Sequence, residues 1–135
     1  MLDIIWDETY SVHIAEIDQQ HQKFTAMLDM LFEAIEAGRP QSALSEILRE
    51  LVAYAGYHFD AEEQLMIKHH YPEFGEHHKE HEVFRNKILG FQKNFQEGRE
   101  TLTGDVVQFM THWIAEHVMK ADKKYAPFLN ARGVF

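Results

Sequence analysis

Apolar residues recur at helical spacing in four segments of the chain. Within each segment they alternate at steps of four and three, which is the spacing of one packed face of an α-helix. Glycine or proline stands in every gap, at Gly38, Pro72 and Gly98. The pattern therefore predicts four helices, over residues 18–37, 41–68, 73–97 and 104–125.

Short links between these segments make consecutive helices antiparallel. The predicted fold class is all-α, an antiparallel up-down-up-down four-helix bundle with an N-terminal arm. We expect one domain over residues 1–135, with the bundle in 18–130 and the arm in 1–17, where no helical period is present. Trp6 and Tyr10 favour an arm packed on the bundle over a flexible tail, because large aromatic side chains gain most from burial.

Seven polar side chains occupy stripe positions where apolar residues are expected. Two pairs, His58 with Glu62 and His77 with His81, are four residues apart, or about 6 Å along one helix face, so each pair could bind one ion. Burying such groups without partners is costly, and one metal centre would remove the cost for all of them. The candidate metal ligands are His21, His58, Glu62, His77, His81, His117 and Asp122.

The remaining histidines provide an internal contrast. A single histidine on an apolar face is more often a hydrogen-bonded core residue than a ligand, and only the set of five on the stripes favours a metal. The others lie off the stripes, near loops or beside a better-placed neighbour, and we assign none of them to the metal: His13, His69, His70, His78 and His112. We expect His78 to face away from the ion, and we interpret His112 as a surface or supporting residue.

The last two candidate ligands have an unusual spacing. His117 and Asp122 are five residues apart, which separates them by about 140° on an ideal α-helix. Both can face the same centre only if the helix departs from α geometry. The spacing predicts a π-type bulge or local unwinding between them.

The ligand types narrow the choice of metal. Five imidazoles and two carboxylates exceed the four ligands of a structural zinc ion, which implies two ions. Imidazole with carboxylate suits iron and leaves manganese, zinc and cobalt open. The chain lacks the Glu-x-x-His motif of ferritin-like di-iron proteins and the His-Glu-x-x-His motif of zinc proteases.

Composition excludes several other classes of function. The absence of cysteine excludes disulfides, thiolate metal sites and a cysteine nucleophile. A formal charge of -9 with dispersed lysine and arginine argues against nucleic-acid binding. The first residues are acidic, and no apolar run reaches the roughly 20 residues that span a bilayer, so we expect no membrane insertion and a cytoplasmic protein.

Four stretches of the sequence resemble the hemerythrins, specifically the single-domain bacterial type, over nearly the whole chain. They are WDETYSVHIAEIDQQH, HFDAEEQLM, YPEFGEHHKEHEVF and HWIAEHVMKADKKY. The order of the ligands, the Tyr-Pro pair, the tryptophan before the last histidine and the Asp-Lys-x-Tyr ending make the resemblance specific. The sequence departs from the family at His13, where a glycine is usual.

The resemblance implies a cofactor of two iron ions bridged by an oxo or hydroxo group, without haem. It assigns His77, His81 and His117 to one iron, His21 and His58 to the other, and Glu62 and Asp122 as bridges between both. The first iron would then have six ligands and the second only five. In such proteins dioxygen binds reversibly at this vacancy as a hydroperoxide.

The resemblance also implies an apolar pocket that protects bound oxygen from water. Its lining residues would be Phe24, Phe59, Trp113, Ile114 and Val118. Ordinary core packing would equally explain an apolar residue at each of these positions.

The expected function is therefore non-enzymatic dioxygen binding for transport or storage. The alternatives are a di-iron enzyme with oxidase, peroxidase or nitric-oxide-related activity, a sensor of oxygen or iron, and sequestration of iron or zinc. Dioxygen is the expected partner, an oxygen-consuming protein that receives it stays open, and we expect a monomer or weak oligomer.

Overall fold

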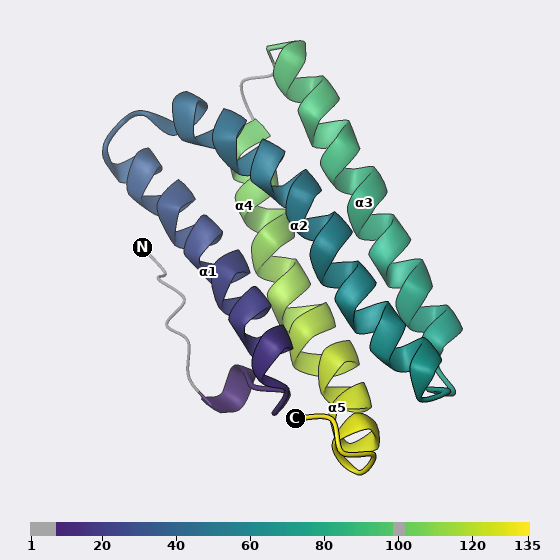
Figure 1. Ribbon diagram of the computed structural model, residues 1–135. Helices are drawn as coiled ribbons and strands as arrows, with labels where there is room; N and C mark the ends of the chain where they lie inside the picture. The colour runs from purple at the N-terminus through teal and green to yellow at the C-terminus, as the bar shows by residue number, and fades with distance from the viewer. Residues whose placement is uncertain (1–7, 99–101) are drawn as a thin grey trace.

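The computed structural model describes residues 8–98 and 102–135, and these residues form helices without any β-strand. The elements are η1 (Glu8–Tyr10), α1 (Ala15–Glu36), α2 (Pro40–Lys68), α3 (Phe74–Gln96), α4 (Leu102–Trp113), η2 (Ile114–Asp122) and α5 (Lys123–Asn130). The last three follow one another without a break and together make the fourth long helix (Figure 1).

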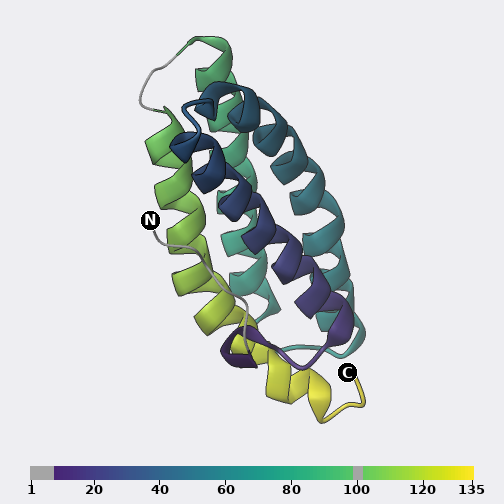
Figure 2. The ribbon, with the colours of Figure 1, turned by 90° about the vertical axis from the view of Figure 1, so that its left-hand side faces the viewer.

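The long helices run alternately up and down, so that consecutive helices are antiparallel (Figures 1 and 2). Helix α2 packs against α1 and α3, and α4 contacts α1, α2 and α3. The predicted all-α, up-down-up-down four-helix bundle is confirmed. None of the helices within the described ranges combines the length with the apolar composition that crossing a membrane would need.

The first helix begins at Ala15, three residues earlier than predicted. The Asp18 carboxylate explains the early start, because it accepts hydrogen bonds from Ser11 Oγ at 2.5 Å and from the backbone N–H of Val12 at 2.9 Å. These bonds fold the preceding segment onto the helix, where Val12 and Ile14 are buried. The rest of the predicted arm, residues 1–7 with Trp6, lies outside the described residues.

The backbone at His13 has a conformation that favours glycine. Its φ of 56° lies in the left-handed region, which costs a residue with a side chain roughly 1–2 kcal/mol. Two contacts hold this conformation in place. The His13 N–H donates to Ser11 Oγ at 3.0 Å, and the His13 carbonyl accepts from Asn130 Nδ2 at 3.1 Å.

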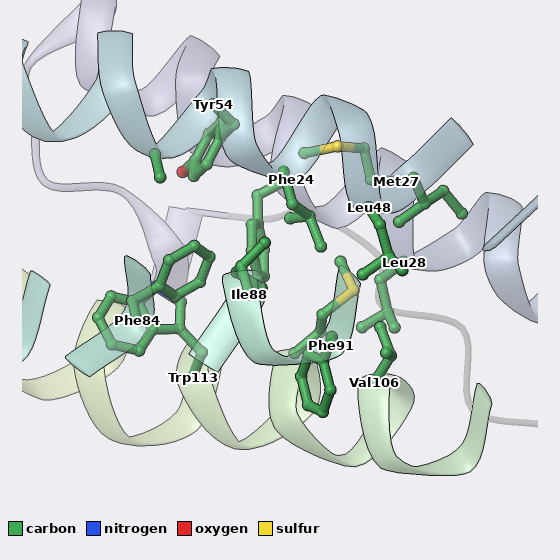
Figure 3. Packing of buried hydrophobic residues seen from close by; sticks show 14 of the residues in the cluster. Phe24, Met27, Leu28, Leu48, Tyr54, Phe84, Ile88, Phe91, Val106 and Trp113 are labelled. Atoms are coloured by element: carbon green, nitrogen blue, oxygen red, sulfur yellow. The ribbon is translucent and has the colours of Figure 1, made fainter. Parts of the chain in front are cut away.

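Two clusters of buried apolar residues fill the described part of the bundle. The larger cluster includes Phe24, Tyr54, Phe84 and Trp113, which interlock between the helices (Figure 3). The smaller cluster consists of Val12, Ile14, Ile17, Met66, Tyr71, Tyr125, Ala126 and Leu129.

Most of the seven candidate ligands lie between these two clusters along the helices. On α1, His21 stands between Ile17 of the smaller cluster and Phe24 of the larger one. On α2 and in the fourth long helix, Glu62 and Asp122 lie between members of the two clusters, whereas His58 and His117 adjoin the larger cluster. On α3, both ligands lie between Phe74, which packs against the smaller cluster, and Phe84 of the larger one. The bundle therefore places a polar layer between two apolar regions.

Candidate metal centre

All four long helices contribute to the polar layer. Helix α1 provides His21, α2 provides His58 and Glu62, α3 provides His77 and His81, and η2 provides His117 and Asp122. Each of these seven residues is at most 3% exposed. Imidazole and carboxylate groups are rarely buried in a protein interior unless a strong partner compensates for the loss of water.

The fourth helix changes its geometry where the last two ligands lie. Residues Ile114–Asp122 form a π-helix, which confirms the predicted departure between His117 and Asp122. Hydrogen bonding from residue i to i+5 widens each turn by one residue, so residues five apart return to one face. The widened turns direct both side chains into the bundle.

Three histidines surround one side of the Asp122 and Glu62 carboxylates. The Nε2 atoms of His77 and His117 each lie 2.9 Å from Asp122 Oδ1. His81 Nε2 lies 3.4 Å from Glu62 Oε1. One ligand atom from each of these five residues fits within a group whose members are all within 4.8 Å of one another.

Two histidines lie on the other side of the same carboxylates. His21 Nε2 is 3.0 Å from Asp122 Oδ2, and His58 Nε2 is 3.0 Å from Glu62 Oε1. These four residues form the second group of ligand atoms within 4.8 Å, and Glu62 and Asp122 belong to both groups. The structure thus brings all seven predicted side chains together, three histidines on one side and two on the other.

Several of the facing atoms are close without being hydrogen bonded. Among the described residues, the buried Nε2 atoms of His77, His81 and His117 and both Asp122 oxygens have no hydrogen-bond partner of acceptable geometry. Buried nitrogen and oxygen atoms that lie close together without hydrogen-bond partners are the arrangement that a cation satisfies. The cluster is therefore suited to binding a metal.

The charges in the cluster favour the same conclusion. Burial and the charge of Asp122 oppose ionisation of Glu62, yet its contacts with His58 and His81 hold its pKa below the usual range. Burial also opposes ionisation of His117, but the charge and contact of Asp122 outweigh it and raise the pKa of His117 to about 10. A raised pKa favours a proton on His117 beside Asp122 in the metal-free protein, where a bound metal would supply the positive charge instead.

Residues outside the predicted set hold several ligands in position. Gln20 Oε1 lies 2.6 Å from His58 Nδ1, Glu63 Oε2 lies 2.6 Å from His81 Nδ1, and Tyr125 donates a hydrogen bond to Glu62 Oε2. Glu80 Oε1 lies 3.5 Å from His117 Nδ1. Sequence reasoning missed these residues, although the position of Tyr125, three residues after Asp122, would have placed it on the same helix face.

His78 has a supporting role that its place in the sequence did not reveal. As predicted, it belongs to neither group of ligand atoms. Its Nδ1 lies 2.8 Å from Glu63 Oε1, so it contacts the carboxylate that holds His81.

Comparison with known proteins identifies the family of this chain. Residues 12–129 match the family model of the hemerythrin HHE cation binding domain. The chain belongs to the hemerythrin family. Among curated hemerythrins, the bacteriohemerythrin of Stenotrophomonas maltophilia (strain R551-3) is 30% identical, over 95% of this chain and 82% of that protein.

Further hemerythrins agree in both sequence and structure. The bacteriohemerythrin of Methylococcus capsulatus (strain Bath) is 30% identical, over 90% of this chain and 92% of its own length. A crystal structure of wild-type hemerythrin is similar with a TM-score of 0.83 at 28% identity, covering 93% of this chain and 97% of that one. The resemblance to the hemerythrins read from the sequence is thus confirmed.

The side chains expected to line an oxygen pocket in this hemerythrin lie in the larger apolar cluster. Phe24, Phe59, Trp113, Ile114 and Val118 are all buried there. The Phe59 ring stacks on His81, with centroids 3.8 Å apart, and the Trp113 ring stacks on His117 at 4.0 Å. Tyr54, which the sequence reasoning did not include, stacks on His58 at 4.7 Å. Apolar and aromatic rings therefore cover ligands on both sides of the site.

Proposed function

We propose that this hemerythrin binds two iron ions in the polar layer. The observation that carries the proposal is the division of the buried ligand atoms into two groups that share Glu62 and Asp122. His77, His81 and His117 would hold one ion with these carboxylates, and His21 and His58 would hold the other. An oxo or hydroxo group would complete the bridge. Imidazole and carboxylate donors in this ratio suit iron.

We further propose that the protein binds dioxygen reversibly, for transport or storage, and is not an enzyme. Ferrous iron held by these residues would supply the reversible electron transfer that dioxygen binding requires. The group with His21 and His58 contains four protein residues, against five in the other group. This difference supports dioxygen binding on the side with two histidines.

The chain's own contribution is to keep water from the site. Loss of bound oxygen is promoted by solvent and protons, so the lining must be apolar and closed. Phe24 and Phe59 are at most 1% exposed, and Trp113, Ile114 and Val118 are also buried. We assign these five side chains to that lining. The same side chains can pack in the core and exclude water from the site.

Iron loading and gas cycling test the proposal directly. Metal-free protein is loaded with ferrous iron under argon, the iron per chain is measured, and optical spectra are recorded through repeated cycles of air and argon. We expect two irons per chain and a band that appears and disappears reversibly. Irreversible oxidation with a released product would instead identify a di-iron enzyme, and failure to hold two irons would refute the proposed centre.

A pair of histidine variants provides the matched control. His58→Ala removes a proposed ligand and should reduce the bound iron below two per chain. His112→Ala removes an exposed histidine that belongs to neither ligand group, so it should leave both the iron content and the spectral cycle unchanged. Equal iron content in the two variants would contradict the assignment of His58.

A further inference from the structure

Two of the ligand histidines have outer partners that differ in charge. His81 Nδ1 lies 2.6 Å from a carboxylate oxygen of Glu63, and His58 Nδ1 lies 2.6 Å from the amide oxygen of Gln20. The two distances are the same, and each partner reaches across from a neighbouring helix. The contacts therefore differ mainly in that one acceptor is anionic and the other is neutral.

Both oxygens of the Glu63 carboxylate are held by histidines of α3. Oε2 contacts His81, and Oε1 lies 2.8 Å from Nδ1 of His78. The Glu63 side chain is only 12% exposed, whereas that of His78 is 43% exposed and stacks on Phe74 with ring centroids 5.7 Å apart. His78 thus contacts the carboxylate from the solvent side and favours the orientation in which Glu63 faces His81.

This contact determines which nitrogen of His81 faces the centre. When Nδ1 donates its proton to Glu63, Nε2 is left with a lone pair, and Nε2 lies 3.4 Å from Glu62 Oε1 within the ligand group. An anionic acceptor also makes the ring a stronger electron donor than a neutral acceptor does. The His81 ring is fully buried and covered by Phe59, so little solvent screens this charge.

Added electron donation stabilises a ferric ion more than a ferrous ion. We infer that Glu63, oriented by His78, is a positioning residue that lowers the reduction potential of the iron bound by His81, whereas Gln20 gives the iron bound by His58 no such charge. The inference rests on the proposed function, because it requires both irons to be present. It assigns the two irons unequal potentials through contacts outside the ligand set.

Two isosteric substitutions exchange the charges of these contacts. Glu63→Gln removes the negative charge beside His81 and keeps an oxygen acceptor, and Gln20→Glu adds a negative charge beside His58. Redox titration of the iron-loaded proteins, followed by their optical spectra, gives two midpoint potentials. We expect Glu63→Gln to raise the midpoint potential of the iron bound by His81, and Gln20→Glu to lower that of the iron bound by His58. Each shift should be about 59 mV, which corresponds to a tenfold change in the ferric to ferrous ratio at a fixed potential.

The iron content separates failure of this inference from failure of the proposed function. Wild-type protein that does not hold two irons would refute the proposed function. Two bound irons with both potentials unchanged in Glu63→Gln would overturn the role of Glu63 alone. If Glu63→Gln loses iron or does not fold, Gln20→Glu decides: a lowered potential supports the inference, and an unchanged one overturns it.

His78→Ala tests the orientation of the carboxylate separately. It leaves the charge of Glu63 in place and removes only the side chain that holds Oε1. We expect a shift in the same direction as that of Glu63→Gln but smaller, and rescue by His78→Gln, whose amide can donate to the same oxygen. A shift in the opposite direction would contradict the positioning role.

Discussion

Removing the hydroxyl of Tyr125 should destabilise the bundle. Tyr125 is 1% exposed, and its hydroxyl donates to Oε2 of Glu62, which is also 1% exposed. Tyr125→Phe keeps the ring and its edge contact with Tyr71, at 6.4 Å between centroids, and removes only the donor. The substitution therefore isolates one hydrogen bond between the fourth helix and α2.

The size of the effect follows from the burial of both partners. A hydrogen bond to a charged group contributes roughly 1.5–3 kcal/mol, and the buried Glu62 oxygen would have no water to replace the lost donor. We expect the free energy of unfolding to fall by about 2–3 kcal/mol. For a chain of this length, the melting temperature should fall by roughly 5–15 °C.

Urea denaturation of the metal-free protein, followed by far-ultraviolet circular dichroism, measures this change. Tyr71→Phe is the matched control, because the Tyr71 hydroxyl donates at 3.2 Å to Glu73, whose side chain is 47% exposed. Water can replace that bond, so the control should lose less than about 1 kcal/mol. A loss under roughly 0.5 kcal/mol in Tyr125→Phe, or equal losses in both variants, would refute the reasoning.

Three further predictions concern the pocket, the turn before α1 and the core. Trp113→Ala or Ile114→Ala should admit water and speed autoxidation of the oxygenated protein, and an unchanged rate in both would remove the pocket assignment. His13→Gly should raise the free energy of unfolding by about 0.5–1 kcal/mol, because glycine adopts the positive φ without strain, and this gain exceeds the added entropy of the unfolded chain. A lower free energy of unfolding, measured by urea denaturation, would contradict this. Phe84→Ala should lower the free energy of unfolding by about 3–5 kcal/mol in the same assay. Val83 is 64% exposed, so Val83→Ala should lower it by less than about 0.5 kcal/mol. Similar losses in the two variants would contradict the packing role of Phe84.

The number, order and inward faces of the helices could be predicted from the sequence because each depends on local periodicity. Even the π-helix was accessible, since the five-residue interval between His117 and Asp122 does not fit an α-helix. The start of α1 was missed because the hydrogen bonds of Asp18 to Ser11 and Val12 depend on how the preceding segment folds back.

The ligand set was easier to predict than its surroundings. A ligand on an apolar stripe stands out because its polarity conflicts with its position. Glu63 and His78 lie on partly exposed faces, where polar residues are ordinary, and only the packing of α2 against α3 brings them together. Glu63 and His78 therefore leave no periodic signal in either helix.

The polar layer between the two apolar clusters has a consequence for how the protein unfolds. Each long helix has residues in both clusters or packed against them, but the layer that joins the clusters contains two buried carboxylates, Glu62 and Asp122, that repel each other. Without a cation, contacts between histidines and these carboxylates are what join the helices across the layer. A metal bound in the layer would link all four helices at one level and make the two ends melt as a single cooperative unit. The site that serves function would then also set the cooperativity of the fold.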